Sequence, residues 1–156
     1  MKILSASFLS LLGLCCATTA QGQALFKESE LSLSLTGGYV DRAEDQWGIG
    51  ASATYFFGTH FGVGATTHWE DFGGSAIDNF AAEVYLRYPL ESIPLAPYAI
   101  ATVGYSWETR EWFESVGFGA EARFDESWGI FADYQYYLNN RTSDAGMFRT
   151  GIRFVF

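Results

Sequence analysis

Apolar and polar side chains alternate with a period of two along this chain, from residue 31 to its last residues. Such alternation is typical of strands that present one apolar and one polar face. Eight segments follow the pattern, and each has about 9 to 13 residues, enough for a tilted strand to cross a bilayer. They are Leu31–Val40, Trp47–Phe57, Phe61–Glu70, Phe80–Leu90, Pro97–Glu108, Trp112–Phe124, Trp128–Leu138 and Phe148–Phe156.

Short, turn-like sequences separate the eight segments. An even number of similar strands joined by short turns is typical of an up-and-down antiparallel meander. We therefore predict an all-β fold, an eight-stranded barrel in which each strand pairs with its neighbours in sequence. The expected turns are Asp41–Gln46, Gly58–His60, Asp71–Asn79, Glu91–Ala96, Thr109–Glu111, Asp125–Ser127 and Asn139–Gly146.

One face of the predicted strands is almost free of charge. Within the eight segments, one alternating set of positions carries a single charged residue, Glu114, whereas the other set carries nine. A soluble barrel turns its apolar set inward, and a membrane barrel turns it toward lipid. The nine charges are Glu70, Glu83, Arg87, Glu108, Glu121, Arg123, Asp133, Arg149 and Arg153.

Side-chain size indicates which set faces inward. The polar set is rich in Gly, Ser and Thr, which fit the narrow lumen of an eight-stranded barrel better than a full set of large rings. Many of the 14 Phe, 9 Tyr and 5 Trp residues lie on the apolar set near strand ends. Two aromatic rims around an aliphatic middle form the paired belt of a bilayer-spanning barrel. The pattern predicts a transmembrane β-barrel.

The first 24 residues have the order of a secretory signal peptide. Met1-Lys2 provides a positive start, an apolar run extends from Ile3 to Ala17, and small residues continue to Ala24. We expect a signal peptide over residues 1–24, cleaved within residues 20–24, and a barrel domain over 25–156. Both cysteines lie in the expected signal, so the mature barrel should have neither disulfides nor thiolate metal sites.

The last strand carries a specific motif. A polar residue, a glycine and two alternating aromatic residues resemble the assembly signal of bacterial outer-membrane β-barrels, and they would be Arg149, Gly151, Phe154 and Phe156. As a whole the chain resembles the small eight-stranded barrels of the OmpA-transmembrane-domain, OmpX and opacity-protein type. The resemblance implies an integral outer-membrane protein, with outer-membrane lipid and the barrel-assembly machinery as partners, and we expect a monomer.

Seven of the inward charges should lie close together in the lumen. Unpaired ions there would be costly, because a lone charge loses its hydration. We therefore predict a paired network that plugs the barrel, with either a structural role or that of a gate for a very small pore. Its members would be Glu83, Arg87, Glu121, Arg123, Asp133, Arg149 and Arg153.

The sequence contains little that points to catalysis. A net charge of −9 disfavours nucleic acid as a partner. Two loose glycine motifs, beginning at Gly48 and Gly117, lie inside predicted strands, so we expect no nucleotide cofactor. Two histidines and scattered carboxylates suggest no metal site.

We therefore expect a non-catalytic outer-membrane barrel with a structural, surface-exposed or weakly permeable, porin-like role. The alternative is a lipid-modifying enzyme of the deacylase type, built on Ser106, His68 and Glu70. These three residues are expected to point inward, toward the lumen, whereas a deacylase would present its triad to lipid on the outer face. Polar residues solvated at the lumen mouth are the simpler interpretation.

Overall fold

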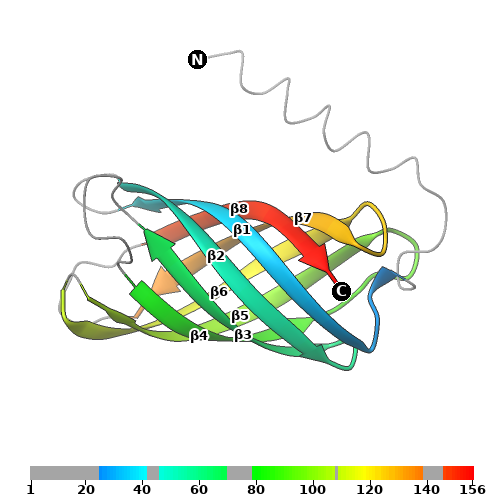
Figure 1. Ribbon diagram of the computed structural model, residues 1–156, viewed down its shortest axis with the longest axis horizontal. Helices are drawn as coiled ribbons and strands as arrows, with labels where there is room; N and C mark the ends of the chain where they lie inside the picture. Colours follow the sequence, from blue (N-terminus) through cyan, green and yellow to red (C-terminus); the bar gives the residue numbers. More distant parts are fainter. Residues whose placement is uncertain (1–24, 42–45, 70–78, 108, 139–145) are drawn as a thin grey trace, which may run out of the picture.

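The computed structural model describes residues 25–41, 46–69, 79–107, 109–138 and 146–156. Eight antiparallel strands close into a barrel in sequence order, as predicted (Figure 1). The expected signal peptide, residues 1–24, lies outside the described residues. The strands are β1 (Ser29–Asp41), β2 (Gln46–Phe57), β3 (Phe61–Trp69), β4 (Asn79–Arg87), β5 (Leu95–Ser106), β6 (Glu111–Arg123), β7 (Trp128–Tyr137) and β8 (Gly146–Val155).

Pairing of the first and last strands closes the barrel. β1 and β8 pair from Ser32↔Val155 to Asp41↔Gly146, and the Phe156 N–H donates to the Leu31 carbonyl oxygen at 2.9 Å. Closure removes the sheet edges, so no strand is left with a row of unpaired backbone groups. Among the described residues, no helix is long and apolar enough to cross a membrane.

Strand ends differ from the predicted segments by at most three residues. β4 ends at Arg87 rather than Leu90, although the Tyr88 and Leu90 N–H groups still donate to the Pro97 and Leu95 carbonyl oxygens. β1 begins two residues before Leu31, at Ser29. This earlier start places Glu30 on the inward face.

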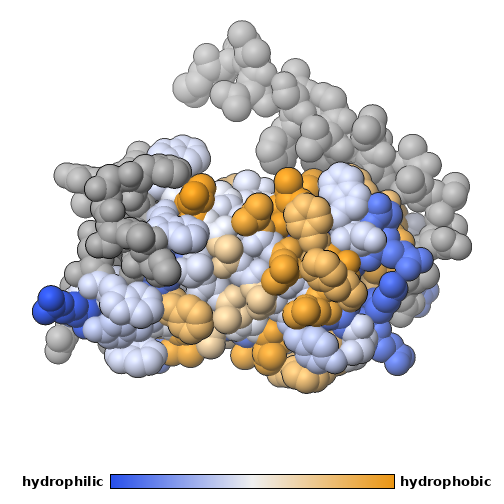
Figure 2. All heavy atoms as spheres, viewed as in Figure 1, coloured by the Kyte–Doolittle hydropathy of each residue, from blue (hydrophilic) through white to orange (hydrophobic). Residues whose placement is uncertain are grey.

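The apolar set faces outward, as the pattern predicted. Exposed and buried residues alternate along β1 and β4, and between the polar ends of β1, Ser29 and Asp41, the exposed ones are apolar or glycine. Figure 2 shows apolar residues on the outer face of the barrel. Phe118 and Leu35 are 69% and 63% exposed, whereas Arg87, Arg123 and Arg153 are at most 2% exposed. The polar residues occupy the interior, so the barrel is inside-out relative to a soluble protein.

Aromatic rings face outward near both ends of the strands. Trp47 packs against Tyr39 with ring centroids 4.9 Å apart near the β1–β2 turn. Phe124 and Trp128 do the same at the opposite end, at 4.7 Å. These positions match the two aromatic rims expected from the sequence.

The lumen also contains rings, in addition to the small residues that were expected there. Phe56, Tyr85, Tyr98 and Phe131 are buried inside the barrel. Glycines make room for them: a Cβ at Gly62 would meet the Phe56 ring at 2.7 Å, and one at Gly151 would meet the Phe131 ring at 2.9 Å. Small and large inward residues therefore alternate to fill a narrow interior.

Candidate functional site in the barrel lumen

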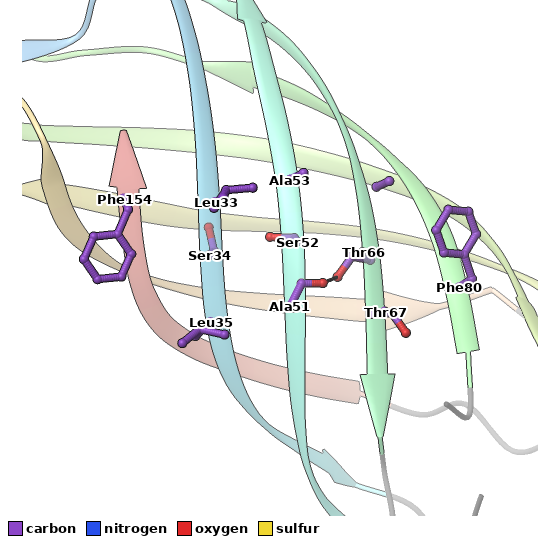
Figure 3. Close-up of a pocket in the computed structure, with 11 residues that line it drawn as sticks. Leu33, Ser34, Leu35, Ala51, Ser52, Ala53, Thr66, Thr67, Phe80 and Phe154 are labelled. Carbon is purple, nitrogen blue, oxygen red and sulfur yellow. Dashed lines mark hydrogen bonds between the residues drawn. The ribbon is translucent and has the colours of Figure 1, made fainter. Parts of the chain in front are cut away.

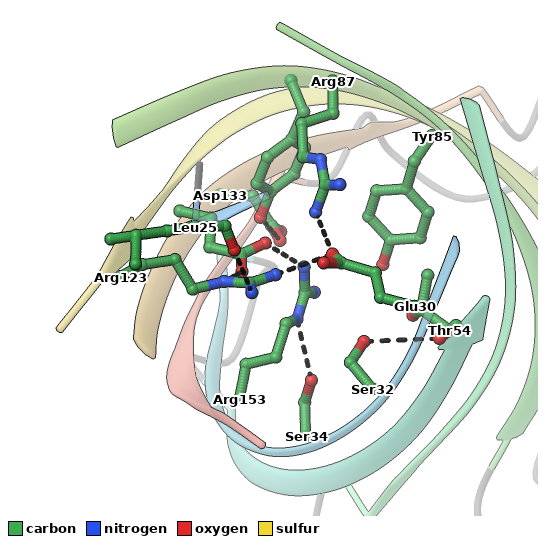
Figure 4. Close-up of polar contacts among 12 residues, drawn as sticks. Leu25, Glu30, Ser32, Ser34, Thr54, Tyr85, Arg87, Arg123, Asp133 and Arg153 are labelled. Carbon is green, nitrogen blue, oxygen red and sulfur yellow. Dashed lines mark hydrogen bonds and ion pairs between the residues drawn. The ribbon is translucent and has the colours of Figure 1, made fainter. Parts of the chain in front are cut away.

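The half of the lumen nearer the termini holds five ionised side chains, which we call the lower cluster: Glu30, Arg87, Glu121, Arg123 and Arg153. The Glu30 carboxylate accepts from Arg87 and, at 2.7 Å, from Arg123 (Figure 4). Glu121 accepts from Arg123 and, at 2.5 Å, from Arg153. The cluster joins β1, β4, β6 and β8 across the barrel.

A second group of charges, the upper cluster, lies farther from the termini and consists of Glu83, Asp133 and Arg149. Arg149 donates to both oxygens of Asp133, at 2.8 and 3.0 Å, and to Glu83 at 2.7 Å. Two buried tyrosines also bind these carboxylates: Tyr85 donates to Glu83 at 2.7 Å and Tyr98 donates to Asp133 at 2.9 Å. Charge-assisted hydrogen bonds of this kind are roughly twice as strong as neutral ones.

All seven lumen residues named from the sequence are buried and in ion pairs. The eighth member, Glu30, is missing from the prediction because it precedes the segment taken as the first strand. With Glu30 included, the two lumen clusters together contain four arginines and four carboxylates, so their charges balance. The arginine excess among the seven predicted residues was the signal that one acid remained to be found. Glu70 and Glu108 lie outside the described residues.

A short segment before β1 covers the lower cluster. The Phe26 side chain is 2% exposed, and the guanidinium carbons of Arg87 and Arg123 lie 4.9 and 4.8 Å from its ring centroid. The Leu25 carbonyl oxygen accepts from Arg123 at 3.2 Å, and the Lys27 N–H donates to Glu30 at 3.2 Å. We call Leu25–Lys27 the strap. Sequence reasoning missed it because no periodicity marks these residues.

Stacking compensates for an incomplete hydrogen-bond set at Arg87. Its Nη2 has no hydrogen-bond partner among the described residues, yet its guanidinium carbon lies 3.7 Å from the Phe56 ring centroid. The guanidinium is therefore held between Phe56 and Phe26. Cation–π contacts of a desolvated guanidinium are worth about 2 kcal/mol.

Ser106, His68 and Glu70 were considered for a hydrolase, and the described residues among them do not come together as parts of a catalytic triad. His68 is buried, its backbone N–H donates to Asn79 at 3.2 Å, and its Nε2 has no partner among the described residues. Ser106 Oγ accepts the Thr109 N–H at 3.3 Å. The β3–β4–β5 register puts Asn79 between the other two, so their backbones are roughly 10 Å apart. Glu70 lies outside the described residues.

The space beside His68 is small. A cavity of about 10 Å³ in the upper lumen touches His68, Gln135 and Arg149. That volume is at the lower limit for one water molecule. No group of three or more potential metal-ligating side chains occurs among the described residues.

The two glycine motifs lie inside strands, as expected. Gly48 and Gly50 belong to β2, and Gly117 and Gly119 to β6. A Cβ at Gly50 would collide with the His68 ring, and one at Gly119 with Asp133 and Tyr98. Gly50 and Gly119 therefore make room for inward side chains.

The four residues of the terminal motif have two different environments. Arg149 is buried in the upper cluster, and Gly151 accommodates the Phe131 ring. Phe154 and Phe156 point outward and are 46% and 72% exposed. The packing of the lumen therefore explains why a polar residue and a glycine stand at positions 149 and 151. It does not explain the two aromatic residues, which lie on the outer face.

Comparison with known proteins places the chain in a family. The family model described as "Outer membrane protein beta-barrel domain" matches residues 6–156. The chain belongs to this family. It is therefore an integral outer-membrane β-barrel protein, and its exposed apolar face contacts lipid. No curated protein sequence matches it.

Solved structures share the fold of this outer-membrane barrel at low sequence identity. The N-terminal β-barrel domain of Pseudomonas aeruginosa OprF has a TM-score of 0.59 and 14% identity, covering 88% of this chain and 99% of that chain. A de novo designed transmembrane β-barrel has a TM-score of 0.62 and 18% identity, covering 83% and 97%. Neisserial surface protein A has a TM-score of 0.53 and 12% identity, covering 82% and 97%.

Proposed function

We propose that this protein is a sealed, non-catalytic barrel that serves the outer membrane as a structural, surface-exposed element. The observation that carries the proposal is the charge pairing across the lumen: four arginines and four carboxylates, from β1, β4, β6, β7 and β8, bind one another in two clusters. Side chains that are fixed to opposite walls and to each other leave no continuous water path between them.

The pairing favours a seal over a gate. Moving Arg149 would leave Glu83 and Asp133 without their counter-ion, and removing one partner of a buried pair costs roughly 3–5 kcal/mol. Moving an arginine of the lower cluster would break at least one of the two ion pairs that hold Glu30 or Glu121. Arg149 is held by three hydrogen bonds to two acids, and the Tyr85 and Tyr98 hydroxyls add a fourth and a fifth bond to the upper cluster. An open state would therefore be rare at equilibrium.

Planar-bilayer recordings test the seal. Folded protein, verified by a shift in gel mobility between unheated and boiled samples, should produce no channel openings above those of a protein-free bilayer. Regular unit conductances from the wild-type protein would overturn the proposal and favour a small pore.

A lipid-modification assay tests the absence of catalysis. Phospholipid and lipopolysaccharide incubated with the purified barrel should keep their masses in mass spectrometry. Release of acyl chains by the wild type but not by Ser106→Ala or His68→Ala would support the deacylase alternative instead.

We also propose a route to the membrane. Residues 1–24 would direct secretion and be removed within residues 20–24, and the assembly machinery would recognise Phe154 and Phe156 on the last strand. Arg149 and Gly151 complete the motif, although both also have a place in the folded barrel. The inserted protein would be a monomer.

A further inference from the structure

The membrane-facing side of the barrel is not uniformly convex. A hollow of about 510 Å³ lies over β1 to β4, and alanines form its floor: Ala51 and Ala53 on β2 and Ala65 on β3. Large side chains border it, with Leu33, Leu35 and Phe154 on one side and Phe80 on the other (Figure 3). We call this hollow the alanine groove.

The outward side chains that line the alanine groove are almost all apolar, and the polar lining residues Ser34, Ser52 and Thr66 belong to the inward set of positions. Among its described lining residues, Thr67 is the polar side chain on the outward face, and its hydroxyl donates to the Asn79 carbonyl oxygen at 2.9 Å. The Thr66 and Ser34 hydroxyls bond inside the barrel, to Ala51 and Arg153. The occupant must therefore be apolar along its length.

The depth of the alanine groove matches the hydrocarbon region of the bilayer. Leu33, Ala53 and Ala65 are aligned by the register, four residues from the strand ends on the side of the termini. Four residues of strand correspond to roughly 13 Å along its axis. The groove thus lies above the aromatic rim of that side and inside the apolar band.

A polar contact point lies directly below the alanine groove. Ser29 and Tyr55 are outward residues of β1 and β2 at the rim on the side of the termini, and their hydroxyl oxygens are 2.6 Å apart. Tyr55 is two residues from Ala53 on the same face of β2. The outward face of β2 therefore leads from a hydroxyl pair at the rim to an apolar hollow farther along the tilted strand.

We propose that the alanine groove binds one acyl chain of a phospholipid from the leaflet on the side of the termini, with its polar end beside Ser29 and Tyr55. The connections between strands are shorter on average on that side, as periplasmic turns of outer-membrane barrels are, so this is the periplasmic leaflet. The volume is within the range of about 300–1,000 Å³ that is usual for small-ligand sites. A flexible acyl chain can follow the floor of alanines and contact both walls of the groove. A protein surface of fixed shape can do so only if its shape is complementary to the groove. The proposal rests on the membrane location of the barrel and is independent of whether the lumen is sealed.

A second copy of the chain is a poorer occupant. In a two-fold dimer the same patch of each subunit meets itself, so a dimer centred on the groove would set one hollow against the other. The enclosed void would lack van der Waals partners on both sides. Lipid chains avoid this loss because they adapt to the surface.

Native mass spectrometry of barrels released from membranes in mild detergent tests the site. We expect wild-type protein to retain about one phospholipid, and Ala53→Phe, which fills the hollow, to reduce retention at least tenfold. Ala132→Phe is the matched control, because Ala132 is an outward alanine on β7 that does not line the groove. This control should retain lipid like the wild type.

Two further variants sharpen the result. Ala65→Leu fills the opposite side of the floor and replaces Ala53→Phe if the phenylalanine prevents folding, which gel mobility reports. Tyr55→Phe should lower retention severalfold while leaving the hollow intact.

Four outcomes would overturn the proposal. They are absence of lipid from the wild type, equal retention by Ala53→Phe and Ala132→Phe, retention of lipopolysaccharide alone, and a wild-type dimer that Ala53→Phe dissociates.

Discussion

Glu121 is the carboxylate on which the lower cluster depends, and replacing it with glutamine should destabilise the barrel strongly. The side chain is 0% exposed and accepts from Arg123 and Arg153. Glutamine has nearly the same shape, so Glu121→Gln removes a charge without creating a cavity. Removing one partner of a buried ion pair costs roughly 3–5 kcal/mol.

The composition of the two clusters makes the effect asymmetric. The lower cluster has three arginines and two carboxylates, whereas the upper cluster has one arginine and two carboxylates. Glu121→Gln enlarges the positive excess of the lower cluster, but Arg153→Met removes it. We therefore expect Arg153→Met to cost only about 1–3 kcal/mol, the value of its hydrogen bonds to charged groups.

Urea unfolding in detergent micelles, followed by tryptophan fluorescence, measures both changes. The double variant Glu121→Gln/Arg153→Met restores the original excess, so it should lose less stability than the sum of the two single variants. The reasoning is refuted if Glu121→Gln unfolds at the wild-type urea concentration, or if Arg153→Met is the more damaging of the two.

Three further predictions concern the lipid face, the strap and the last strand. Ala132→Arg should lower the unfolding free energy in urea titrations by about 2–4 kcal/mol if residue 132 lies near the bilayer midplane. Leu138→Arg, beyond the end of β7, should lower it by only about 0–1 kcal/mol. The reverse order would contradict the placement of the barrel in the membrane. Phe26→Ala should lower the unfolding free energy by about 3 kcal/mol, because it removes a buried ring and uncovers Arg87 and Arg123. An unchanged urea midpoint would show that the strap does not stabilise the lower cluster. Deleting Phe156 should reduce the amount of protein in the outer membrane of cells, while refolding into detergent still succeeds. Gly151→Ala should impair both membrane insertion and refolding, because a Cβ there meets Leu35 and Phe131. Normal outer-membrane levels of the truncated chain would rule out the aromatic terminus as the signal for assembly.

The fold and the inside-out arrangement follow from local sequence pattern. A period of two decides which residues share a face, and the small residues of the polar set together with the aromatic rims on the charge-free set indicate that the charge-free set faces lipid. Both statements depend on neighbours along the chain, which is why the eight strands and the inward direction of Arg87, Arg123 and Arg153 could be predicted without coordinates.

The pairing inside the lumen depends instead on how the barrel closes. Glu30 and Arg123 are 93 residues apart, and Arg149 and Glu83 are 66 apart. Which charges meet is set by the register of all eight strands, because a slip in one ladder would move each inward residue along the barrel axis. Sequence alone could show that the lumen charges needed partners, but not that Glu30 would join them or that Phe26 would fold back to cover them.

The alanine groove has the same origin. Alanines on β2 and β3 are ordinary outward residues in the sequence. They become a floor only because the register aligns Ala53 and Ala65 with Leu33 and puts Ala51 in the row of Leu35 and Phe80. Local alternation therefore determined the strands and the face that meets the membrane. Closure of the barrel decided which ions pair, and the register of β1 to β4 decided where the surface is hollow, since both depend on contacts between strands and not on alternation within one strand.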